Sequence, residues 1–183
     1  MILKNVDDKN KVHWFVMIAY KREKDAEAAL SGDDGLEYYI AKRYIVKTIR
    51  GIKKRVMVPS IPNILFIHAS HAEIIKFKEK YNFIKFMIWH KTTGTEYLVV
   101  NDAEMENFIR ISSSDAESVK YYQPDEINLK KGTRVRILGG EFDGVEGVFV
   151  KVDGKRSKQV VVVIPDLLAV SVYVHPDLIE VLD

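Results

Sequence analysis

One stretch near the carboxy terminus constrains the fold of this chain more than any other. Residues 132–150 read GTRVRILGGEFDGVEGVFV. Apolar residues alternate with Arg134 and Arg136, which is typical of a strand with one face in solvent. Two glycines then interrupt the strand, and Asp143 with Gly144 supplies a turn in which glycine can adopt a positive φ angle. Because alternation resumes after Gly147, the stretch predicts two strands joined by a glycine-rich turn.

The rest of this segment is also rich in strand patterns. We expect five short strands, at residues 133–138, 145–152, 159–164, 169–174 and 178–182. Five short strands in so few residues predict a small closed or nearly closed β-barrel, which leaves no exposed strand edges. The runs 160–164 and 170–174 are dominated by β-branched residues, which favour a sheet over a helix. Pro165 lies between them and would interrupt a continuous helix.

The first part of the chain alternates between strand and helix patterns. We expect strands at 12–20, 37–50, 52–58, 63–69, 83–89 and 97–100, with a hairpin tip near Gly51. Residues 23–30 have the pattern of a short helix, and Ser70 with Glu73 forms a capping box that begins another. A third helix should begin near Asn101. This order predicts an α/β sandwich, in which helices pack on one face of an antiparallel sheet.

Charge and composition divide the chain into two domains and a linker. Residues 1–111 hold 19 Lys and Arg against 14 Asp and Glu, residues 112–128 hold one against four, and residues 129–183 hold eight of each. The middle segment is polar, acidic and contains a proline, which is typical of exposed chain between modules. We therefore expect domains at 1–111 and 129–183, with a linker at 112–128.

Composition excludes several classes of protein. The chain is 47% hydrophobic and 30% charged, as in globular proteins, and it has no cysteine for a disulfide or a thiolate zinc site. No apolar run is long enough to span a bilayer, and the start lacks the apolar stretch of a signal peptide. We therefore expect a cytoplasmic monomer. No catalytic constellation, cofactor motif or metal-ligand set is present, so we expect no enzyme.

The glycine-rich stretch resembles the KOW motif, and local similarities extend along nearly the whole chain. Residues 14–17, 59–67 and 174–182 resemble the first strand, the signature segment and the final KOW strand of the NusG family. The resemblance implies an α+β protein, with a NusG amino-terminal domain followed by a five-stranded, SH3-like KOW barrel. It further implies a transcription elongation or antitermination factor that suppresses pausing or termination.

The resemblance also suggests a binding site for the clamp region of RNA polymerase. By this resemblance, residues 61–66 of the signature segment would lie against the apolar depression that receives the clamp helices, and Trp14 would either help to line that depression or be a partly buried core residue. The site residues implied are Trp14, Ile61, Pro62, Ile64 and Phe66. Strand alternation places Ile61, Asn63 and Leu65 on one face and Pro62, Ile64 and Phe66 on the other. Both faces carry apolar groups, so a partner covers one face or the segment is ordinary core.

A basic hairpin is a second candidate site. Residues 42–55 contain seven Lys and Arg and no acidic residue, and residues 50–55 resemble the basic hairpin that precedes the signature in the specialised paralogue RfaH. Uncompensated positive charge attracts a phosphate backbone, because each contact releases condensed counterions. The alternative is a solvated hairpin whose charges prevent edge pairing. The nucleic-acid site would comprise Lys21, Arg22, Lys47, Arg50, Lys53, Lys54 and Arg55, and DNA of the transcription complex is the expected ligand.

Two departures from the family pattern favour a specialised paralogue of the RfaH and UpxY kind. Ile61 and Ile64 replace the aromatic residues of the signature, and residues 165–169 differ from the Phe-Gly-Arg turn of housekeeping members. The KOW domain would contact a ribosomal protein or Rho. The alternative function is that of a KOW-containing, RNA-binding protein of the ribosome. A pI near 8.6 and the lack of basic tails count against that alternative.

Overall fold

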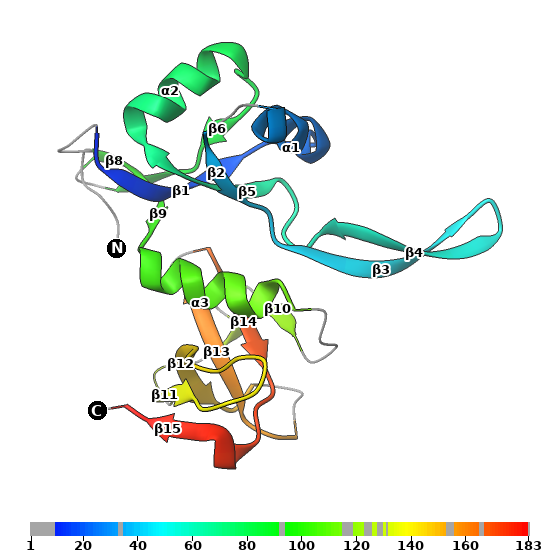
Figure 1. Cartoon of the computed structure of the whole chain (residues 1–183), viewed down its shortest axis with the longest axis vertical. Coiled ribbons are helices and arrows are strands. Elements are labelled where there is room, and N and C mark those ends of the chain that lie inside the picture. The colour runs from blue at the N-terminus through cyan, green and yellow to red at the C-terminus, as the bar shows by residue number, and fades with distance from the viewer. Residues whose placement is uncertain are drawn as a thin grey trace. The chain divides into compact units, whose positions relative to one another are not determined.

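The computed structural model describes residues 10–32, 35–91, 94–114, 119–122, 126–127, 130, 132–152, 156–164 and 167–182. Two compact units make up the chain, residues 1–102 and 103–183. The first unit, unit 1, holds α1 and α2 with strands β1 to β9, and the second, unit 2, holds most of α3 with strands β10 to β15 (Figure 1).

The main sheet of unit 1 has five antiparallel strands. Its order is β2 (Glu37–Tyr39), β5 (Ile64–Ser70), β1 (Val12–Ile18) and β6 (Lys85–Phe86), and β9 (Val99–Val100) also pairs with β1. The two central strands pair over their whole length, from Val12 opposite Ser70 to Ile18 opposite Ile64. The antiparallel sheet predicted from the order of elements is therefore present.

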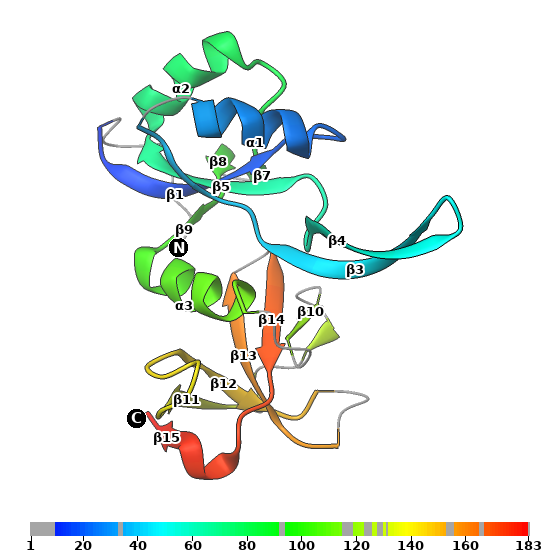
Figure 2. The ribbon, with the colours of Figure 1, turned by 45° about the vertical axis from the view of Figure 1, so that its right-hand side comes forward.

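One face of this sheet packs against two helices. Phe15, Met17, Leu65 and Ile67 are fully buried there, together with Ala26 and Leu30 of α1 (Glu23–Gly32) and Ile74 and Phe77 of α2 (His71–Lys80). Both helices lie on the same face of the sheet in two views (Figures 1 and 2). Burial of these large apolar side chains is the main favourable contribution to the fold of unit 1.

The capping box expected at residue 70 begins α2. The Ser70 side chain accepts a hydrogen bond from the Glu73 backbone N–H, and the Glu73 carboxylate accepts one from the Ser70 backbone N–H at 2.8 Å. These bonds satisfy two backbone donors that have no partner within the helix. The prediction of a helix start at this position is confirmed.

Two hairpins of unit 1 lie outside its main sheet. One pairs β7 (Ile88–Lys91) with β8 (Gly94–Tyr97). The other pairs β3 (Lys42–Ile49) with β4 (Ile52–Pro59) as a separate two-stranded sheet. Figures 1 and 2 show the β3–β4 hairpin extending away from the helices and main sheet of its unit.

Unit 2 contains one six-stranded antiparallel sheet. Its order is β10 (Lys120–Tyr122), β14 (Leu168–Val172), β13 (Gln159–Ile164), β12 (Glu146–Val150), β11 (Thr133–Ile137) and β15 (Ile179–Val181). A short 3-10 helix, Pro176–Leu178, precedes the last strand. The five predicted strands are all present, and the runs of β-branched residues at 160–164 and 170–172 form strand as expected.

Closure of this sheet into a barrel is not confirmed. Among the described residues, no backbone pairing joins the two end strands β10 and β15. The sheet also has a sixth strand, β10, within the segment expected to be a linker. Tyr122 of β10 packs against a core formed by Ile127, Val150, Val152, Val161 and Ala169. The tyrosines of this segment therefore have a structural role in unit 2.

The third helix differs from its expected grouping. Helix α3 (Asp102–Ser112) begins where predicted and buries Met105 and Phe108, but from Ala103 onward it belongs to unit 2. The first domain expected from the sequence, residues 1–111, would include nearly all of this helix. Part of the predicted linker, residues 115–118, 123–125 and 128, lies outside the described residues.

Within the described ranges, no helix is both long and apolar enough to cross a membrane.

Candidate functional site

The β3–β4 hairpin is a regular ribbon with a tight turn. Its strands pair without a break from Lys42 opposite Pro59 to Ile49 opposite Ile52. The two turn residues, Arg50 and Gly51, have φ angles of +51° and +78°. Two consecutive positive φ angles are typical of the type I′ turn, which matches the twist of the flanking strands. The hairpin tip predicted at these residues is therefore confirmed.

Positive charge lies on both faces of this ribbon. Directly opposite residues in an antiparallel pair share a face, so Lys47 and Lys54 lie together on one face. The opposite face carries Lys53, which is opposite Thr48, and Arg55, which is opposite Val46. All four cationic side chains are exposed. The sequence contains no Asp or Glu from residue 38 to residue 72, so the hairpin contributes no acidic group of its own.

The contacts of the hairpin's cations differ along its length. At the base, Lys42 forms an ion pair with Glu27 of α1. Further out, the Arg55 guanidinium lies over the Tyr44 ring, 3.9 Å from its centroid. Lys42 is therefore neutralised, whereas the density of positive charge increases toward the tip.

The structure places Lys21 and Arg22 at the turn between β1 and α1. Arg22 forms an ion pair with Asp25 at 2.7 Å and lies 3.8 Å from the centroid of the Phe83 ring. The Lys21 ammonium lies 5.2 Å from the centroid of the Tyr20 ring. These contacts are made within the turn and with Phe83, and none of them joins either residue to the cations of the hairpin. Their membership of one nucleic-acid site stays a prediction.

Asn63 links this turn to the segment that follows the hairpin. Its side-chain Oδ1 accepts a hydrogen bond from the Lys21 backbone N–H at 2.7 Å, and its own backbone N–H donates to Glu23 Oε1 at 2.9 Å. Asn63 has a φ angle of +66°, and Lys21 has +56°. Asparagine is one of the few residues that tolerate this conformation. Sequence reasoning missed this role, although an asparagine between two apolar segments is a common turn signal.

This turn corrects the expected strand at residues 61–66. Strand β5 begins at Ile64, so Ile61, Pro62 and Asn63 form a turn and do not alternate between two faces of a strand. The positive φ angle of Asn63 breaks the extended backbone at that point. Pro62 is exposed and Ile61 is partly exposed.

The remaining candidates for polymerase binding share one sheet face. Register places Ile64 opposite Ile18, Phe66 opposite Val16 and His68 opposite Trp14. These six residues form the second face of the main sheet, opposite the face that packs against α1 and α2. Trp14 stacks on the His68 ring at a centroid distance of 4.7 Å, and Trp14 and Phe66 are buried. Ile64 is partly exposed, at the end of the face next to Ile61 and Pro62.

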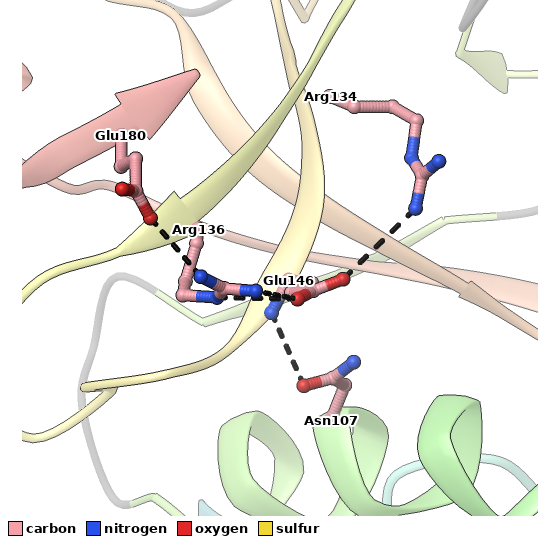
Figure 3. Close-up of polar contacts among 5 residues, drawn as sticks. All are labelled: Asn107, Arg134, Arg136, Glu146 and Glu180. Atoms are coloured by element: carbon pink, nitrogen blue, oxygen red, sulfur yellow. Dashed lines mark hydrogen bonds and ion pairs between the residues drawn. The ribbon is translucent and has the colours of Figure 1, made fainter. Parts of the chain in front are cut away.

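The arginines of the glycine-rich stretch are engaged in ion pairs. Arg136 of β11 donates to Glu146 Oε1 at 2.7 Å and to Glu180 Oε2 at 3.1 Å, and Arg134 lies 4.0 Å from the other Glu146 oxygen (Figure 3). The hydrogen bonds that Arg136 donates to the Glu146 carboxylate raise the pKa of Arg136 above its ordinary value. The Glu146 backbone N–H donates to Asn107 Oδ1 of α3 at 3.1 Å. These arginines hold three strands together, which leaves little free charge for RNA.

No metal-binding cluster of His, Asp and Glu exists among the residues that the structure describes. His68 lies between two carboxylates: its Nδ1 is 2.6 Å from Glu37 Oε2, and its Nε2 is 3.6 Å from Asp102 Oδ1. This arrangement fixes the ring against Trp14 through two carboxylates.

Comparison with known proteins places this chain among transcription factors. No curated protein is significantly similar to it. A solved structure on domain interaction in Thermotoga maritima NusG is 19% identical, with a TM-score of 0.43; the alignment covers 94% of this chain and 98% of that chain. The NusG family, described as transcription termination factor nusG, matches residues 12–119. Because this match covers more than half of the chain, the protein belongs to the NusG family, whose members are non-enzymatic factors that act on the transcription machinery.

Proposed function

We propose that this protein is a transcription elongation or antitermination factor that binds RNA polymerase through unit 1 and suppresses pausing or termination. The observation that carries the proposal is the family match over residues 12–119, which includes the whole main sheet and all three helices. The clamp region of the polymerase would contact the end of the second face where Ile61, Pro62 and Ile64 have exposed surface. Apolar contact of this kind suits an amphipathic helix of a partner.

The departures from the family signature support a specialised role within this function. Isoleucines at positions 61 and 64 keep the apolar character of the site and remove the aromatic rings. Such a change alters the shape of the contact without adding charge. Unit 2, whose Arg134 and Arg136 are occupied by carboxylates, would bind a protein such as a ribosomal protein or Rho in preference to RNA.

Co-purification with core RNA polymerase tests the proposal. Ile64→Asp places a charge in the apolar contact and should abolish co-purification, because an unpaired buried charge costs several kcal/mol or about a hundredfold or more in affinity. Ile64 is preferable to Phe66, which is fully buried and whose replacement would disrupt the core. The matched control is Ile75→Asp on α2, where the isoleucine is 41% exposed.

The outcomes separate the two candidate functions. Loss of binding in Ile64→Asp but not in Ile75→Asp, with both variants folded by circular dichroism, supports the polymerase contact. Retained binding in a folded Ile64→Asp variant would place the contact elsewhere. Co-sedimentation with ribosomes in place of polymerase would favour the ribosomal alternative. Transcription on a template with a defined pause measures the activity itself, and the protein should shorten the pause.

A further inference from the structure

We propose that the β3–β4 hairpin binds double-stranded DNA by entering its major groove. The inference rests on the proposed function in one respect, because it takes the nucleic acid of the transcription complex as the partner of the hairpin. It adds the form of that nucleic acid and the way in which it is held.

The distribution of charge favours a groove over a flat surface. Lys47 and Lys54 lie directly opposite each other on one face, and like charges in that arrangement destabilise a strand pair unless an anion lies nearby. Lys53 and Arg55 lie on the other face. A flat acidic surface could neutralise only one of these faces. A groove has a row of phosphates on each side, so both faces of the ribbon would meet negative charge.

The dimensions of the hairpin agree with the major groove. A two-stranded ribbon is about 10 Å thick with its side chains, which fits a major groove about 12 Å wide and exceeds a minor groove about 6 Å wide. The hairpin belongs to no larger sheet, and it extends away from the rest of its unit in two views (Figures 1 and 2). DNA can therefore approach both of its faces without meeting the main sheet.

The hairpin lacks the surface that single-stranded DNA needs. Proteins that bind single strands stack the bases on aromatic side chains. Tyr44 is the only aromatic residue between Lys42 and Pro59, so the hairpin offers a single ring, and the Arg55 guanidinium already lies over one face of it at 3.9 Å. Duplex DNA needs no such platform, because its bases remain stacked on each other. The same residues therefore favour duplex over single-stranded DNA.

Apolar side chains at the tip complete the match. Ile49 and Ile52 flank the turn and are 42% and 62% exposed. In the major groove, apolar side chains contact the methyl groups of thymine. Ile49 and Ile52 would reach the base edges while the lysines contact the phosphates on either side.

Fluorescence anisotropy of the full-length protein with a 20-base-pair duplex, and with one of its strands alone, tests this inference. We expect tighter binding to the duplex. Each phosphate contact contributes about 0.9 to the slope of log affinity against log salt, so replacing Lys47, Lys53 and Lys54 with Gln should reduce the slope by about 2.7. Between about 50 and 200 mM salt, the wild-type affinity should then fall about 40-fold more than that of the variant.

Two further variants make the test specific. Replacing Lys24, Lys76 and Lys85 with Gln removes the same charge from exposed positions outside the hairpin, and it should leave the slope unchanged. Replacing Ile49 and Ile52 with Ser should weaken duplex binding about tenfold at constant slope, since about 1.4 kcal/mol of apolar contact is lost. Circular dichroism checks the fold of each variant.

Several results would overturn the inference. The first is equal or tighter binding of the protein to the single strand. The second and third are an unchanged salt slope in the hairpin variant and an unchanged duplex affinity in the tip variant. The last is a wild-type protein that does not bind the duplex, combined with a hairpin variant that no longer co-purifies with polymerase. The last result would assign the hairpin to an acidic protein surface. Duplex binding through the hairpin by a protein that does not co-purify with polymerase would refute the proposed function and leave this inference standing.

Discussion

Gly147 provides the sharpest test of the packing in unit 2. The residue lies opposite Val135 in the pairing of β11 with β12. A Cβ atom at this position would lie 2.7 Å from the Val161 carbonyl oxygen and 2.9 Å from Val160 Cγ1, both in β13. The nearer atom belongs to the backbone, so a side-chain rotation cannot relieve the contact. Gly147→Ala must therefore displace β13 from β12.

The expected cost is that of forcing an extra group into a packed region, about 1–3 kcal/mol. Unit 2 extends from residue 103 to 183. For a domain of that size, 1 kcal/mol corresponds to about 4–8 °C in Tm, so a cost of about 2 kcal/mol predicts a decrease of about 8–16 °C. Hydrogen exchange measured by mass spectrometry localises the effect. Protection of the β12 and β13 amides should fall about 30-fold, while protection of β1 and β5 stays unchanged.

Gly140→Ala is the matched control in the same glycine-rich stretch. Gly140 has a φ angle of +74°, and a Cβ atom there would meet nothing within 4 Å. This variant should lose about 1–2 kcal/mol through backbone strain. Protection in β13 should change only in proportion to the global loss of stability. A Gly147→Ala protein within about 0.5 kcal/mol of the wild type, with normal exchange in β13, would refute the steric argument.

Two predictions concern unit 1, each measured by denaturant unfolding. Ser70→Ala should cost about 1 kcal/mol at pH 7, because it removes the helix cap. Hydrogen bonds from Ser70 to the Glu73 carboxylate lower the pKa of Glu73. The stabilisation that these bonds contribute is therefore present at neutral pH and is lost as the pH falls through the lowered pKa. Equal costs of Ser70→Ala at pH 7 and at pH 3 would contradict this role of the Ser70–Glu73 hydrogen bonds. Asn63→Gly should cost about 1 kcal/mol through the lost hydrogen bond, and Asn63→Ala about 1–2 kcal/mol more through strain at its positive φ angle. A smaller cost for Ala than for Gly would show that the turn adapts.

Features fixed by neighbouring residues could be predicted from the sequence. The capping box of α2 depends on Ser70 and Glu73, which are three residues apart. The hairpin turn at Arg50 and Gly51 depends on adjacent residues and the apolar segments that flank them. In both cases the physical cause lies within one turn of chain, so the pattern of residues carries the information.

Features that depend on distant residues could not be predicted in the same way. Strand β10 forms because Lys120–Tyr122 pair with Ala169–Ser171, and nothing in its polar, acidic surroundings indicates that partner. Closure of a sheet depends on pairing between its first and last strands, which the number of strands does not determine. Grouping α3 with unit 2 reflects hydrogen bonds from Arg110 to the Asp143 carbonyl and from the Glu146 backbone to Asn107. A count of strands and helices contains none of these contacts.

The two candidate sites of unit 1 were predictable to different degrees for a physical reason. A charged hairpin can be recognised from the sequence, because exposed charge needs no tertiary partner and the absence of acids is visible directly. An apolar binding face looks like core in the sequence, since burial within the chain and burial against a partner favour the same residues. The structure separates these cases residue by residue: Phe66 and Trp14 are already buried, whereas Ile64, Ile61 and Pro62 retain surface. Apolar surface that the chain leaves exposed beside a buried face is therefore the better guide to where the polymerase would bind.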